Sequence, residues 1–262
     1  MEEPEIVKRP FKTLLKALDS FFNDDTTYYA ASLSFFTIFS ILPIIALLIA
    51  IISSLDIVQN YSDIFIKYTF DILNPTHSED FINTFQNYIS NSDKLGWLGI
   101  IYMLFVFIMF FKDYEYIVNK IHHAKRKPLL QSFFFYLFFL VTLPLMLTAL
   151  NILLSFYDNT IFNWLITFSF AWLIFFGLFK LSVNRHVDTK AAAISSLFTL
   201  VTLSVTKNLF IYYVIYNKTY TTIYGSLAIL LFSFFWIYVS WVIYLYGMKM
   251  CHKLNVNYKN NK

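Results

Sequence analysis

Six long apolar stretches limit the folds open to this chain. Each can cross a bilayer as a helix, which takes about 20 residues. Only 14% of the 262 residues are charged, against about 25% in an average soluble domain, and 58% are hydrophobic. A soluble fold cannot hide so much apolar surface, because its own surface must be wet. We therefore predict an all-α integral membrane protein with six transmembrane helices. The predicted spans are about 28–55, 95–119, 132–156, 161–181, 191–216 and 224–248.

The lysines and arginines predict the orientation of the chain. Loops on the cytoplasmic side of a membrane carry an excess of these residues. With the N-terminus inside, 16 of the 20 Lys and Arg are cytoplasmic, three lie outside and one, Lys207, lies within a span. We expect both termini to be cytoplasmic. Anionic lipid headgroups are the expected partners of the cytoplasmic basic loops.

Two segments outside the spans have amphipathic patterns. Residues 8–22 are too short and too charged to cross, so they predict an N-terminal interfacial helix or an ordinary helix packed under the bundle. Residues 56–94 have a net charge of −4 and predict a short helical extracytoplasmic segment. No linker divides the chain, so we treat 1–262 as a single membrane domain. Its oligomeric state is left open.

The sequence lacks the motifs of the common enzyme classes. It has no phosphate-binding loop, no Gly-rich nucleotide fingerprint and no nucleophile elbow. His122 and His123 are adjacent, so they do not share a helix face, and no Cys, Asp or Glu lies nearby at ligand spacing. The basic run at 125–127 is short and lies at a predicted membrane boundary, which favours lipid over nucleic acid. We predict no enzyme, no catalytic residue, no cofactor and no metal.

Lys207 is the most unusual residue, because it lies well inside the fifth predicted span. An ammonium group in hydrocarbon costs at least about 2.5 kcal/mol and usually faces the bundle interior or a water-filled cavity. Three interpretations remain open. In the first, Lys207, with Asn208, contacts a substrate or an ion or forms part of a proton path. In the second it has a structural pairing, and in the third it snorkels toward the outer interface. Asp113 and Glu115, near the cytoplasmic end of the second span, are expected to be solvated or salt-bridged.

Hydroxyl residues form stripes on two predicted spans. Such a stripe can line a polar pathway, but small hydroxyl residues also allow close helix packing, and we favour packing. The stripe residues are Ser195, Thr199, Thr202 and Thr206 on the fifth span, and Ser34, Thr37 and Ser40 on the first.

Several short motifs together resemble the YihY/BrkB family of bacterial membrane proteins, once labelled ribonuclease BN. They include Tyr224-Gly225-Ser226-Leu227-Ala228, Ser40-Ile41-Leu42-Pro43, Asn119 followed by Arg126-Lys127-Pro128, and Asn184-Arg185-His186-Val187. The resemblance covers about residues 11–250. It implies six spans in the bacterial cytoplasmic (inner) membrane and a virulence-factor label that names a phenotype. The motif residues Tyr224, Gly225, Ser226, Pro43, Asn119 and Arg185 are expected to serve helix packing. Lys207 stands where we expect an acidic residue in parts of the family, so an acidic proton site there would not carry over.

Two functions from different classes fit the sequence. A transporter would move a lipid, an anionic solute or an ion through a polar cavity near Lys207. A non-transporting scaffold or envelope-integrity protein would act through its loops. The residues present form no recognisable nuclease metal site, so we do not expect ribonuclease activity. Substrate, direction and energy coupling are not specified by the sequence.

Overall fold

The computed structural model describes residues 25–53, 87, 96–156, 159–216 and 226–260. Its long elements in these residues are all helices, and their bounds follow the apolar stretches closely. The predicted interfacial helix at 8–22, nearly all of the segment 56–94, and Tyr224 and Gly225 lie outside the described residues. The helices are α2 (Asp25–Ser53), α5 (Gly96–Ile121), α6 (Leu129–Ser155), α7 (Thr160–Leu181), α8 (Thr189–Tyr216) and α10 (Ser226–Asn260).

Local sequence explains where several helices begin and end. Asn159 caps α7, because its side-chain oxygen accepts hydrogen bonds from the N–H groups of Ile161 (3.0 Å) and Phe162 (3.3 Å). Pro128 precedes α6, where a missing N–H costs nothing. Helix α2 continues through Pro43 and does not end there. The basic tail expected after residue 248 is helical, since α10 continues to Asn260.

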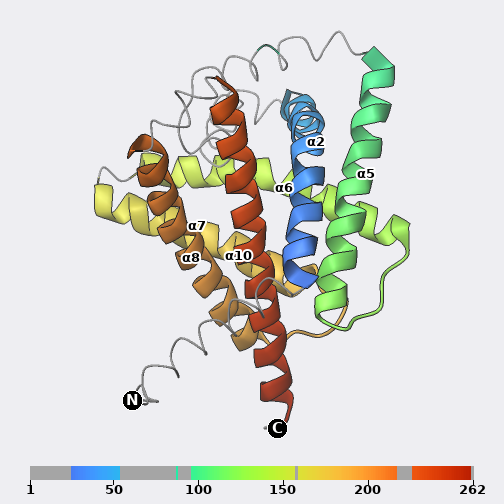
Figure 1. Cartoon of the computed structure of the whole chain (residues 1–262), viewed down its shortest axis with the longest axis vertical. Coiled ribbons are helices and arrows are strands. Elements are labelled where there is room, and N and C mark those ends of the chain that lie inside the picture. The colour runs from blue at the N-terminus through green and yellow to red at the C-terminus, as the bar shows by residue number, and fades with distance from the viewer. Residues whose placement is uncertain (1–24, 54–86, 88–95, 157–158, 217–225, 261–262) are drawn as a thin grey trace, which may run out of the picture.

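The helices do not all run in one direction. In Figure 1, α2, α5 and α10 run roughly along the long axis, whereas α6 and α7 cross that direction at a wide angle. Within the described residues, α7, α8 and α10 contain stretches long and apolar enough to cross a membrane. The helical class is therefore confirmed, and the number of crossings and the orientation remain predictions.

The main core lies between α10, α2 and α5, with α6, α7 and the start of α8 packed around it. Phe107, Phe179, Leu33 and Leu245 are fully buried there. A second, smaller cluster joins the far ends of α8 and α10, where the rings of Phe210 and Trp236 stack at 5.3 Å. Many large apolar side chains point outward instead, as expected for a protein solvated by lipid. Examples more than half exposed are Phe35, Phe39, Phe134, Phe138, Trp164 and Leu209.

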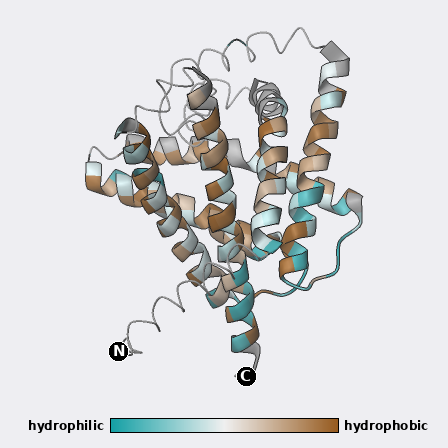
Figure 2. Ribbon diagram, viewed as in Figure 1, coloured by the Kyte–Doolittle hydropathy of each residue, from teal (hydrophilic) through white to brown (hydrophobic). Residues whose placement is uncertain are grey.

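Polar residues are concentrated at one end of the helices. Figure 2 shows hydrophilic positions near the lower ends of α5 and α10 and apolar positions above them. The loops 122–128 and 182–188 and the last turns of α10 meet at this end, as the hydrogen bonds described below demonstrate. It is the end at which the fold places buried polar side chains side by side.

Candidate functional site

A polar junction, made of Glu115, Asn119 and Asn184, ties α5 to the loop between α7 and α8. Glu115 Oε1 accepts hydrogen bonds from Asn184 Nδ2 (2.9 Å) and from the backbone N–H of Lys127 (3.2 Å). The Asn119 side-chain oxygen accepts the Asn184 backbone N–H at 2.7 Å, and its amide donates to the Glu115 carbonyl at 2.9 Å. Glu115 and Asn119 lie one helical turn apart and so share a face of α5. Both side chains are almost fully buried.

The last turns of α10 hold the same loop from its other side. Asn255 Oδ1 accepts the backbone N–H of Asp188 at 2.8 Å, and Asn255 Nδ2 donates to the His186 carbonyl at 3.2 Å. Asp188 in turn accepts the Lys190 N–H at 2.8 Å at the start of α8. The entry into α8 is therefore fixed by hydrogen bonds to two helices distant in sequence.

A chain of hydroxyl groups crosses the core beside the polar junction. Tyr114 donates to Ser182 at 3.3 Å, and Ser182 donates to the Leu178 carbonyl. The hydroxyls of Tyr114 and Tyr244 lie 2.5 Å apart. Either of the two tyrosine hydroxyls can be the donor in this contact. The chain of hydroxyls links α10, α5 and α7.

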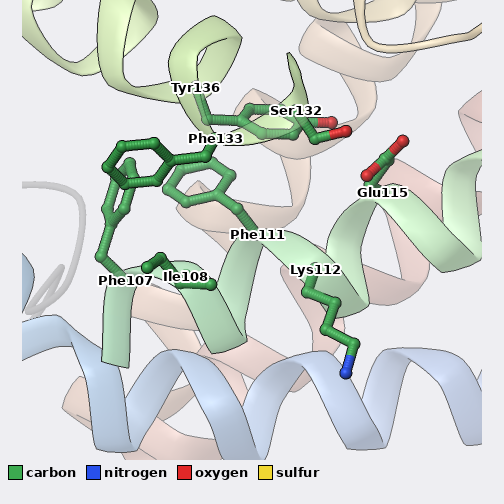
Figure 3. A pocket seen from close by; sticks show the side chains of 8 residues that line it. All are labelled: Phe107, Ile108, Phe111, Lys112, Glu115, Ser132, Phe133 and Tyr136. Carbon is green, nitrogen blue, oxygen red and sulfur yellow. The ribbon is translucent and has the colours of Figure 1, made fainter. Parts of the chain in front are cut away.

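A small cavity opens between α5 and α6 beside Glu115. Its volume is about 10 Å³, close to what one water-sized particle needs. Figure 3 shows its lining, with the Glu115 carboxylate and the Ser132 hydroxyl on one side and aromatic rings on the other. The Ser132 hydroxyl is buried and makes no hydrogen bond with any described residue. The lining residues are Phe107, Ile108, Phe111, Lys112, Glu115, Ser132, Phe133 and Tyr136.

Three histidine rings meet where α5 ends. The His252 ring on α10 lies edge-on to those of His122 (5.3 Å between centroids) and His123 (5.2 Å). Burial lowers the pKa of His122 to about 3, and the nearby charges of His252 and Arg185 act in the same direction. The Nε2 atom of His122 finds no hydrogen-bond partner among the described residues. No group of three or more His, Cys, Asp or Glu residues in the described part of the chain is placed to hold a metal ion.

Lys207 lies far from the polar junction, in the second half of α8. Its side chain is half-buried, and the neighbouring Asn208 is exposed while Thr206 is half-buried. One turn later Phe210 packs into the cluster with Trp236. Lys207 therefore lies on a helix that is long and apolar enough to cross a membrane.

The hydroxyl stripe on α2 bonds mostly to its own helix. Ser34 donates to the Ala30 carbonyl (2.5 Å) and Thr37 to the Leu33 carbonyl (2.7 Å), whereas Ser40 makes a long contact of 3.4 Å. Thr37 also accepts the indole N–H of Trp241 on α10 at 2.8 Å. This hydroxyl therefore joins two helices.

The stripe on α8 divides into a packed half and an open half. Ser195 and Thr199 are buried and donate to carbonyls of their own helix, at 2.5 and 2.7 Å. Thr202 does the same at 2.8 Å but is only half-buried. Beside Thr199 the α10 backbone comes very close: a Cβ added to Gly247 would lie 1.9 Å from the Thr199 hydroxyl. Glycine is the residue that permits this approach.

The family-motif residues have separate surroundings. Pro43 is buried within α2, Asn119 belongs to the polar junction, and Arg185 is exposed beside the histidine rings. Ser226 begins α10. Together with Gly247, these positions lie at helix contacts and helix ends.

Sequence reasoning missed the polar junction around Glu115. Glu115 was expected to be solvated or salt-bridged, but it is 3% exposed and makes no ion pair with a described residue. The expectation is wrong because the loops 122–128 and 182–188 pack against α5 and each supplies one neutral donor, the Lys127 backbone N–H and the Asn184 side-chain amide. The sequence feature that corresponds to this buried carboxylate is Asn119, which lies one turn after Glu115. Its partner Asn184 lies near a helix end that is distant in sequence.

Comparison with known proteins agrees with this architecture. The family described as virulence factor BrkB matches residues 17–262. A UPF0761 membrane protein of Alteromonas mediterranea is 25% identical over 254 residues, covering 91% of this chain and 86% of its own length. One from Aggregatibacter aphrophilus is 26% identical, covering 86% and 85%, and one from Vibrio parahaemolyticus is 26% identical, covering 92% and 80%. No solved structure matches the chain. From its apolar helices and this match over most of its length, the chain is a membrane protein that belongs to the BrkB virulence factor family.

Proposed function

We propose that this protein transports a lipid, an anionic solute or an ion across the bacterial cytoplasmic membrane. The observation that carries the proposal is Lys207, a half-buried ammonium group in an apolar helix long enough to span. Ionisable groups at such positions are costly and usually serve a substrate or ion path. A positive charge suits a carboxylate or phosphate group as its partner. Asn208 and Thr206 beside it offer further hydrogen-bonding groups.

The basic end of α5 supports a contact with anionic lipid headgroups. Lys120 lies over the rings of Tyr29 (5.1 Å) and Tyr116 (5.6 Å), and Arg126 lies over Tyr116 at 5.0 Å. These charged groups are exposed, and the aromatic rings hold them in place. Interfacial tyrosines and clustered basic side chains are the common means of binding an anionic leaflet.

Dry packing favours a scaffold as the second candidate. The first half of α8 meets α10 so closely at Gly247 and Thr199 that no water fits between them. A bundle packed this way along its whole length would act through its loops. The test of the proposal must therefore measure whether water reaches position 207.

The test is cysteine accessibility at position 207 in intact membranes. The buried native thiol is removed by Cys251→Ala, Lys207→Cys is introduced, and a charged, membrane-impermeant thiol reagent is added from each side. We expect labelling from one side only, because a polar pathway would bring water to this position. Leu209→Cys, on the exposed apolar surface, should stay unlabelled, and the exposed Asn257→Cys should be labelled from the basic side. If both controls behave and Lys207→Cys is unlabelled from either side, the pathway is refuted and the scaffold is favoured.

A further inference from the structure

The Glu115 carboxylate is buried without a cation to balance it. It is 3% exposed, and its two hydrogen-bond donors are neutral N–H groups that both bind Oε1. Within the part of the chain that the structure describes, no hydrogen bond ends on Oε2 and no ion pair reaches the carboxylate. A buried charge is costly unless it is paired or coordinates a metal ion.

The basic side chains around Glu115 are engaged elsewhere. Figure 3 shows the Lys112 amine pointing away from the cavity toward α2, and its charge acts on the neighbouring Asp113. Lys127 reaches Glu115 only through its backbone, while its ammonium group lies 5.6 Å from the Phe135 ring. The positive charge that the carboxylate needs is therefore not supplied by these lysines.

A second unpaired group faces the same cavity. The Ser132 hydroxyl is 6% exposed, makes no hydrogen bond with a described residue, and lines the cavity together with Glu115. A serine in a helix usually satisfies its hydroxyl by donating to its own backbone, as Ser34 and Ser195 do. An unbonded hydroxyl beside an unbalanced carboxylate marks a place where both oxygens serve a ligand.

We propose that this cavity binds one monovalent inorganic cation between the Glu115 carboxylate and the Ser132 hydroxyl. One carboxylate balances a single positive charge, whereas a divalent ion such as Ca²⁺ or Mg²⁺ would leave one positive charge unbalanced in this largely apolar lining. The volume of about 10 Å³ admits one water-sized particle and no organic cation. The aromatic walls add favourable contacts with a cation. Lys207 does not line this cavity, so the proposed cation site does not depend on the proposed transport function.

Thermal unfolding of the full-length protein in detergent tests the site. The midpoint is measured while NaCl or KCl replaces N-methyl-D-glucamine chloride at constant ionic strength. We expect the small cation to raise the midpoint by several degrees along a saturating curve, since a ligand that binds only the folded state stabilises it. Glu115→Gln keeps an acceptor for Lys127 and Asn184 and should abolish the effect. Ser132→Ala should weaken the apparent affinity at least tenfold.

The matched control is Ser240→Ala, whose hydroxyl bonds only its own helix at 2.8 Å and which should respond as the unaltered protein does. If Glu115→Gln does not fold, Ser132→Ala against Ser240→Ala decides the question. The proposal would be refuted if neither NaCl nor KCl changed the unfolding midpoint of the unaltered protein. It would also be refuted if Ser132→Ala kept the full apparent affinity for the cation. Stabilisation by MgCl₂ at lower concentration than NaCl would overturn the monovalent assignment. None of these results depends on labelling at position 207.

Discussion

The two halves of α8 carry similar residues but differ in their surroundings. In the first half Ser195, Ser196 and Thr199 are buried, Trp172 donates to Ser196 at 3.1 Å, and Gly247 brings the α10 backbone against Thr199. In the second half Thr202 and Lys207 are only half-buried. The spacing of hydroxyl residues along α8 therefore does not show by itself whether they serve helix packing or line a polar pathway. The distinction depends on whether a partner helix covers them. The first half is packed closely against α10, whereas the second half combines the packed Phe210 with half-buried polar positions.

The strongest test of the packed half is Gly247→Ala. The new methyl group would overlap the Thr199 hydroxyl at 1.9 Å and lie 3.1 Å from Thr199 Cβ and Phe179 Cζ, so these side chains or the helices must shift. We expect a loss of about 1–3 kcal/mol or more of stability, measured as a lowered unfolding midpoint in detergent. Gly177→Ala is the matched control, because its added Cβ meets only Phe139 at 3.9 Å. Equal effects of the two changes would refute the close contact.

Asn119→Ala should have the next largest effect. It leaves the partly buried Asn184 backbone N–H without its acceptor and removes the side-chain hydrogen bond to the Glu115 carbonyl. Leaving a buried group unsatisfied costs about 1–3 kcal/mol. The control is Asn208→Ala, an exposed asparagine in the open half of α8, which should change stability by less than about 0.5 kcal/mol. A midpoint unchanged by Asn119→Ala would contradict the polar junction.

Acid should destabilise the end of the molecule where the histidines meet. The pKa of His122 is lowered to about 3 in the folded state, while the unfolded chain has the usual value near 6.5. The unfolded state therefore binds the proton first, and the stability that neutral His122 contributes is present above pH 6.5 and lost as pH falls toward 3. Between pH 7.5 and 4.5, the unfolding midpoint of His122→Asn should fall less steeply than that of the unaltered protein. The control His186→Gln, at an exposed position, should show the same decrease as the unaltered protein.

Two threonine substitutions give the finest comparison. Thr37→Val removes the acceptor of the Trp241 indole N–H, a bond of 2.8 Å between α2 and α10. Thr202→Val removes only a bond within α8. We expect Thr37→Val to cost about 1 kcal/mol more than Thr202→Val in the same unfolding assay. The opposite order would place the important hydroxyl in the open half of α8.

Much of the fold follows from the sequence, because the bounds of the helices are set by local apolar runs and by capping or helix-breaking residues. In the structure Asn159 caps α7 and Pro128 precedes α6, and both are local features of the sequence. The polar junction does not follow, because Glu115 and Asn184 are 69 residues apart and meet only when α5 packs beside the α7–α8 loop. The crossing directions of α6 and α7 depend on packing of nearly uniformly apolar surfaces, which carry little directional information. Lys207 is visible in the sequence because it interrupts an apolar run, whereas the burial of Glu115 depends on loops that are distant in sequence.

The contact between Gly247 and Thr199 has a consequence for how related chains can differ. With no space at 247 beyond a hydrogen, the side chain at 199 fills the remaining gap. The two positions therefore behave as one volume shared by two helices, and a larger residue at 247 requires a smaller one at 199. We expect Thr199→Gly to restore much of the stability that Gly247→Ala removes, although each change alone is harmful. Positions 199 and 247 should accordingly be inherited as a pair.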